Sequence, residues 1–137
     1  MEITIKAIIE IAGFPEEHVK NTMNMVIENL GKEKGISILK KNIAPVEKVT
    51  QMWSNFAELE LRISNFKELN DFCFNYMPSS IEIMDPIKLN INSNEVDDLL
   101  NDLLARLHNF TMFLKNLQAE NIVLKREKEA SGGEKKK

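Results

Sequence analysis

Hydrophobic and polar residues alternate at the start of the chain. Every second residue from Ile3 to Ile11 is apolar, and the residues between them are mostly polar, with Ile8 as the exception. The same alternation returns at residues 57–63, where apolar Ala, Leu and Ile positions are separated by Glu58, Glu60 and Arg62. A period of two residues is typical of a strand with one buried face. We therefore expect strands at residues 2–11 and 57–63.

Shorter stretches with the same period suggest further strands. One begins at Ile36, after Gly35, and its end is left open because Pro45 interrupts the pattern. Another covers residues 81–83. Residues 87–91 alternate once more and fit either a short fifth strand or an extended connector.

Two short helices are expected between these strands. Pro15 and the two glutamates after it suit a first helical turn, and Gly31 suits its end. Asn65 and Glu68 have the spacing of a capping box for the second helix, which Pro78 stops. The apolar stripe of this second helix consists of Leu69, Phe72, Cys73 and Tyr76.

The order strand-helix-strand-strand-helix-strand over residues 2–84 is similar to the ferredoxin-like plan. We therefore predict an α+β fold: a ferredoxin-like βαββαβ head at residues 1–92, with an antiparallel sheet and two helices on one face. The strand order would be 4-1-3-2. The similarity is to an architecture that hosts many activities, so the fold itself does not indicate the function.

A long helix is expected at residues 93–129, with Ser93 or Asn94 as its N-cap. Residues 87–131 contain neither glycine nor proline. Apolar residues recur at alternating steps of three and four, which is the heptad period of a coiled coil. We call the following eight residues the heptad seam: Leu100, Leu103, Leu107, Phe110, Leu114, Leu117, Asn121 and Leu124.

The register of the seam favours a parallel pair of identical helices. Leu100, Leu107, Leu114 and Asn121 fall at heptad position a, and the other four seam residues at d. A single Asn at a fixes register in parallel two-stranded coils. Glu120 then lies at g and Lys125 at the following e, where charges pair across a parallel dimer. We expect a homodimer through this seam, although an antiparallel pair is not excluded.

Two other ways of covering the seam remain possible. The seam could bind a different protein, or the helix could fold back on its own sheet. About 30 helical residues span roughly 45 Å, whereas a short strand covers only about 17–20 Å. At most half of the helix could therefore lie on its own head, so the rest would still need a partner.

The composition of the chain indicates its cellular compartment and the kinds of partner that suit its charge. The chain has 137 residues, a net charge of −3 and a single cysteine, Cys73. No apolar run is long enough to span a membrane, and we expect a cytoplasmic protein without a secretory signal. Residues 125–137 hold six basic and three acidic residues, which leaves an acidic body that suits nucleic acid poorly. Residues 130–137 are expected to form a disordered charged tail.

The sequence contains no recognisable catalytic constellation. His18 and His108 each lack a second histidine at helical spacing, and no phosphate-binding glycine motif is present. We expect no catalytic, cofactor-binding or metal-binding residues, and a non-enzymatic interaction or assembly module. The alternatives are a small-molecule-responsive regulatory domain of ferredoxin-like type, with its ligand near Gly13 and Phe14, or a subunit of a larger hetero-complex.

Overall fold

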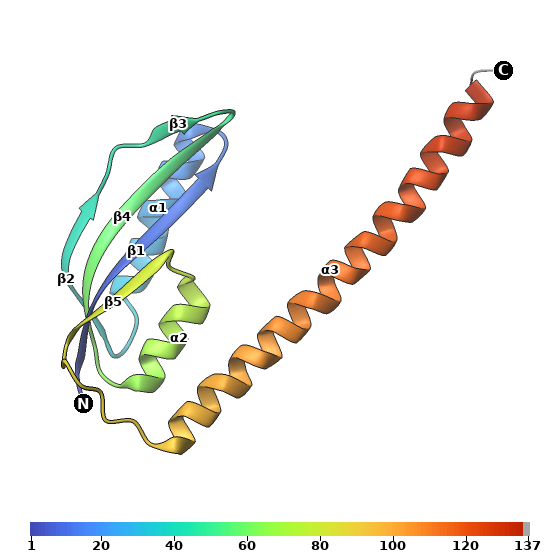
Figure 1. The fold of residues 1–137 in the computed structure, drawn as a ribbon. Coiled ribbons are helices and arrows are strands. Elements are labelled where there is room, and N and C mark those ends of the chain that lie inside the picture. Colours follow the sequence, from blue (N-terminus) through green and yellow to red (C-terminus); the bar gives the residue numbers. More distant parts are fainter. Residues whose placement is uncertain (136–137) are drawn as a thin grey trace. The chain divides into compact units, whose positions relative to one another are not determined.

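The computed structural model describes the backbone of residues 1–135 and the side chains of residues 1–132 (Figure 1). Within this range the chain is a mixed α+β protein with a five-stranded antiparallel sheet and three helices. The strands are β1 (Ile3–Gly13), β2 (Ile36–Ile43), β3 (Glu47–Val49), β4 (Met52–Ile63) and β5 (Ser80–Asp85). The helices are α1 (Glu16–Gly31), α2 (Phe66–Tyr76) and α3 (Ser93–Lys135). The chain divides into two compact units: Met1–Glu95, which we call the head, and Val96–Lys137.

Strands β1 and β4 form the centre of the sheet, whose order is β2-β4-β1-β5, with β3 also paired to β4. The two central strands pair along their whole length, from Ile3 opposite Ile63 to Gly13 opposite Trp53. The outer strands are less regular, because β2 shifts register between Ile38 and Lys40. The long central pair therefore sets the frame on which the shorter strands align.

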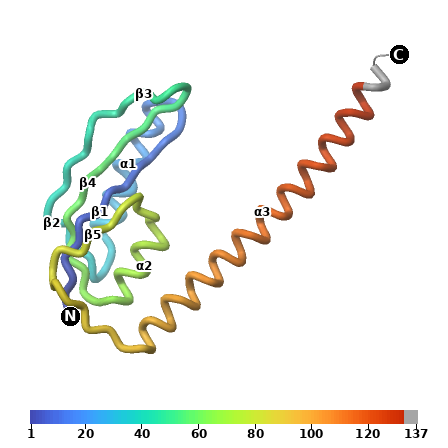
Figure 2. The backbone as a smooth tube through the Cα atoms, viewed as in Figure 1, coloured from blue at the N-terminus to red at the C-terminus, as the bar shows by residue number. Residues whose placement is uncertain are grey.

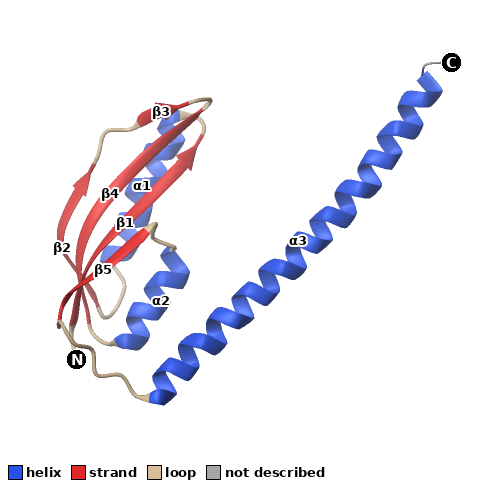
Figure 3. Cartoon of the chain, viewed as in Figure 1, coloured by secondary structure: helices blue, strands red, loops and turns tan. Residues whose placement is uncertain are grey.

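The hydrophobic core lies on one face of this sheet. The odd-numbered residues of β1 from Ile3 to Ile9 and of β4 from Ala57 to Ile63 are buried. Met23, Ile27 and Leu30 of α1, and Leu69 and Phe72 of α2, belong to the same core cluster. Both helices therefore cover the same face of the sheet (Figure 3). The opposite face, which we call the open face, carries the residues that alternate with the buried ones.

The short helices begin and end with the expected local chemistry. Helix α1 starts directly after Pro15 and ends at Gly31. At the start of α2 the backbone N–H of Glu68 donates to Oδ1 of Asn65 at 2.9 Å, which confirms the predicted cap. Met77 adopts the left-handed conformation at the end of α2, one residue before Pro78.

Strand β4 is longer than predicted, and β3 was not predicted at all. The expected strand at residues 57–63 begins at Met52 instead, so Trp53 lies within it. Val49 pairs with Met52 across a tight turn, and Gly13 of β1 pairs with Trp53. These residues become strand because distant strands supply their hydrogen-bond partners, a cause that local alternation does not report.

The chain between β5 and α3 is an extended connector, so residues 87–91 do not form the fifth strand that was the other possibility. Leu89 packs against the core of the head, which anchors this connector. The backbone N–H of Asn92 donates to Oε2 of Glu95 at 3.1 Å, as in a capping box. The helix therefore begins after Asn92, and the prediction of Ser93 or Asn94 as N-cap was wrong.

Helix α3 also ends later than the predicted position 129 (Figure 2). It extends to Lys135, so residues 130–135 of the expected disordered tail are helical, and 136–137 lie outside the described residues. Each residue added to an existing helix gains one backbone hydrogen bond, which can offset the roughly 1 kcal/mol that a glycine such as Gly132 costs. No helix in the described part of the chain is both long and apolar enough to cross a membrane.

Candidate functional site on the long helix

The eight residues of the heptad seam all lie on α3, and together they form a stripe of accessible apolar surface. The seven apolar members are between 37% and 61% exposed. Asn121 is exposed as well. Large apolar side chains repeated at heptad spacing on one helix form the surface that a second helix covers in a coiled coil.

The helix surface is hollowed at the C-terminal half of the seam. A hollow of about 410 Å³ is lined by Leu114, Leu117, Gln118, Glu120, Asn121 and Leu124. In a coiled coil, each side chain of one helix enters a hole formed by four residues of the facing helix. On one helix those four stand at i, i+3, i+4 and i+7, and this hollow contains two such sets, beginning at Leu114 and at Leu117. Its lining therefore has the geometry of two successive holes.

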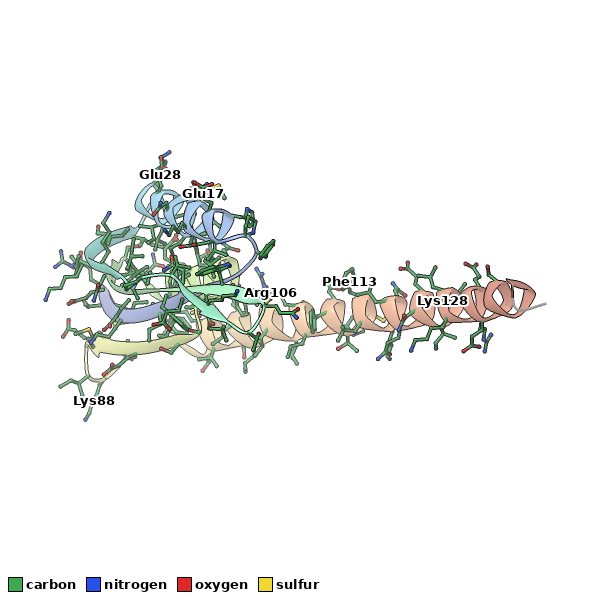
Figure 4. The ribbon with its side chains drawn as sticks, turned by 90° about the horizontal axis from the view of Figure 1, so that it is seen from above. Glu17, Glu28, Lys88, Arg106, Phe113 and Lys128 are labelled. Carbon is green, nitrogen blue, oxygen red and sulfur yellow. The ribbon has the colours of Figure 1, made fainter. Side chains whose placement is uncertain are left out.

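The residues beside the seam differ along α3. Leu104, at position e, and Phe113, at position g, are both exposed, and Figure 4 shows the Phe113 side chain projecting from the helix. Arg106 Nε lies 3.1 Å from Oδ1 of Asp102, one turn earlier on the same helix. The flanks thus combine apolar side chains with charges, and the charges become more frequent towards Lys128.

The open face of the head is a second accessible surface, and it is charged. Glu82 of β5 lies opposite Lys6 of β1, Lys6 opposite Glu60 of β4, and Glu60 opposite Lys40 of β2. These four residues, which we call the charged row, alternate in sign across four strands. Lys40 Nζ lies 3.7 Å from Glu60, and Lys6 Nζ lies 3.3 Å from Glu58. Sequence alternation had placed Lys6, Glu58 and Glu60 away from the core, but it could not show which of them are neighbours.

The polar groups that could carry chemistry are spread over the head. His18 is exposed on α1, and Cys73, on the apolar stripe of α2, is half-buried. Burial raises the pKa of the Cys73 thiol, which disfavours the reactive thiolate. Among the described residues, no three metal-ligating side chains of His, Cys, Asp or Glu gather at one place. Phe14, at the proposed ligand position, is 72% exposed.

One hydrogen bond joins α2 to the segment after α1. The Tyr76 hydroxyl donates to Oε1 of Glu33 at 3.0 Å. Burial, followed by the hydrogen bond to Glu33 and its negative charge, raises the pKa of Tyr76 to about 12. Beside this pair is a groove of about 440 Å³ that also contains Asn29 and Asn75. The hydrogen bond between Tyr76 and Glu33 links α2 to the segment after α1, which is a structural role.

The fold and the candidate site together define a class of protein. Its members have a mixed α+β head followed by a long helix that carries an accessible heptad seam. The chain belongs to the MJ0538 family, whose family model matches residues 4–133. It is 28% identical over 110 residues to a Methanocaldococcus jannaschii protein named "Uncharacterized protein MJ0538". That alignment covers 79% of this chain and 42% of the relative, so the chain spans about two fifths of the relative's length. No solved structure matches the chain.

Proposed function

We propose that this protein is a non-enzymatic assembly module in which α3 pairs with α3 of a second copy as a parallel coiled coil. In this proposal the head is a ferredoxin-like domain, and the dimer holds two heads together. The observation that carries the proposal is the accessible heptad seam with its pair of holes. An apolar stripe of this length is costly to leave in water and is covered in full by an identical helix in register.

The residues beside the seam support the parallel orientation. In a parallel dimer, position g of one helix meets position e of the next heptad on the other helix. Leu99, at position g, would then meet the partner's Leu104, at position e, which widens the apolar contact near the start of the coil. Glu120 would meet Lys125 of the partner subunit, an attraction of tenths of a kcal/mol that favours orientation more than affinity. Asn121 would face its own counterpart, so that the two amides hydrogen-bond.

Two features argue against the alternative that the seam is covered by the chain's own sheet. Helix α3 has 43 residues and would span about 65 Å, whereas the 12 residues of β4 span about 40 Å. The open face presents the charged row, and covering it with leucine side chains would remove these charges from water without new partners. The single cysteine suits a reducing compartment, and we propose a cytoplasmic location on that ground.

Sedimentation velocity of the purified chain over a concentration series tests the pairing. A dimer at tens of micromolar and below is expected, and a monomer throughout would refute the proposal. Orientation is tested in a Cys73→Ser background carrying Leu100→Cys near one end of the seam. In a parallel pair the two introduced thiols lie together, and an added oxidant links them as a disulfide. In an antiparallel pair they lie far apart, and no disulfide-linked dimer forms. A chain that is monomeric alone but copurifies with another protein would indicate a subunit of a hetero-complex.

A further inference from the structure

The charged row on the open face has a symmetry that the individual ion pairs do not reveal. Read across the sheet from β5 to β2, its signs are negative, positive, negative and positive, at Glu82, Lys6, Glu60 and Lys40. Adjacent strands are about 4.8 Å apart, so the row crosses the sheet in about 15 Å. The side chains of Lys40 and Glu82, at its two ends, are exposed.

We propose that the open faces of two copies dock on each other, and that the charged row is what aligns them. This inference rests on the proposed function, because the coiled coil supplies the second copy. The two-fold axis would run parallel to the strands, between β1 and β4. That axis reverses the order of the row, so that Glu82 faces Lys40 of the partner subunit and Lys6 faces the partner's Glu60. Every charge in the row then meets one of opposite sign.

The neighbouring rows of the open face bring no like charges together about the same axis. In one of them Thr4 lies opposite Arg62 on the sheet, and in another Ile8 lies opposite Glu58. The two-fold axis places Arg62 against Thr4 of the partner subunit, and Glu58 against the partner's Ile8. Like charges meet in neither row. A two-fold axis at right angles to the strands would instead set each residue of the charged row against its own copy, and all four contacts would be repulsive.

The size of the face explains why the contact needs the helix. Four strands cover about 19 Å, and their paired length is about 20–26 Å, so each copy would bury about 400–500 Å². The total of about 800–1,000 Å² is less than the roughly 1,200 Å² of a stable independent interface. Two heads held by one coiled coil face each other at an effective concentration that can reach the millimolar range. A contact that is too weak alone is therefore populated within the dimer.

Complementary charge reversals at the ends of the row test the docking. Lys40→Glu alone sets two acidic pairs against each other in its dimer, and Glu82→Lys alone sets two basic pairs against each other. An equimolar mixture restores attraction, because the acidic side chains of the Lys40→Glu copy meet the basic ones of the Glu82→Lys copy. Within one head, both substitutions stay unfavourable in the mixture, because position 40 neighbours Glu60 and position 82 neighbours Lys6. Recovery by mixing can therefore come only from contact between copies.

Native mass spectrometry of the 137-residue chains, one of them isotopically labelled, measures the fraction of mixed dimers. We expect a roughly three- to tenfold preference for mixed over like dimers at low salt, shrinking as salt rises. Lys34→Glu mixed with Glu17→Lys is the matched control, since it changes the same charges away from the open face and should mix statistically. Wild-type dimers with statistical mixing of the open-face variants would overturn this inference and leave the coiled coil standing. A monomeric wild type would overturn both.

Discussion

Replacing Leu114 by alanine should weaken the dimer without weakening the helix. Leu114 is 42% exposed on α3, and fully burying a leucine is worth about 1.5–3 kcal/mol. Covering the remaining surface then contributes about 0.6–1.3 kcal/mol per helix, and about 1.3–2.5 kcal/mol for the two leucines of a dimer. At 1.4 kcal/mol per factor of ten, the Kd should rise about ten- to sixtyfold. Alanine is the better helix former, so loss of helix cannot account for that change.

Met112→Ala is the matched control. Met112 is 47% exposed and lies two residues before Leu114, but its heptad position is f, on the opposite side of the helix from the seam. If the seam is the interface, this variant should keep the wild-type Kd. Sedimentation equilibrium over a wide dilution range measures all three Kd values, and circular dichroism checks that helix content is unchanged. Equal weakening by both substitutions would show that general loss of apolar surface, rather than the seam, controls association, and the reasoning would fail.

Three further predictions concern other parts of the chain. Asn121→Leu should stabilise the assembly while loosening its orientation, because the Asn amide leaves the apolar seam; a less stable assembly in urea would contradict this. Phe72→Ala should lower the free energy of unfolding of the head by about 3–5 kcal/mol, since Phe72 is 1% exposed, whereas Phe14→Ala should change it little in the same denaturant titration. Tyr76, the single tyrosine, should titrate at about pH 12 by tyrosinate absorbance, and Glu33→Gln should lower that value. Because this pKa is raised above the unfolded value of 10.0, stability from Tyr76 is complete below pH 10 and falls as the pH rises towards 12.

The parts of the fold that could be predicted are those in which neighbouring residues carry the signal. Alternation places the buried face of β1 correctly, and Asn65 with Glu68 marks the start of α2 because a cap is a contact over three residues. The N-terminal part of β4 could not be predicted in this way, because its signal lies in other strands. Met52 to Phe56 show no alternation of their own, and they are strand because β1 and β3 lie alongside.

The heptad seam could be predicted from the sequence, whereas the charged row could not. The heptad seam is a property of one helix, so its residues can be placed on a single stripe from spacing alone. The charged row depends on register between four strands, and a shift of one residue would move each side chain to the other face. Lys40 shows the difficulty, since the irregularity after Ile38 changes which residues of β2 share a face. Only the paired strands show that Lys40 and Glu82 stand at the two ends of one row.

The extent of the family match bears on what the helix is for. The family model matches residues 4–133, a range that spans nearly the whole sheet and most of α3. A coiled coil that served only to pair would need no particular head. A head whose proposed self-complementary face is too small to associate alone would need a helix of this kind, because tethering raises the local concentration of its partner. In the proposed dimer the heptad seam and the charged row would act together: the helix would provide the proximity, and the open face would favour one orientation of the two heads.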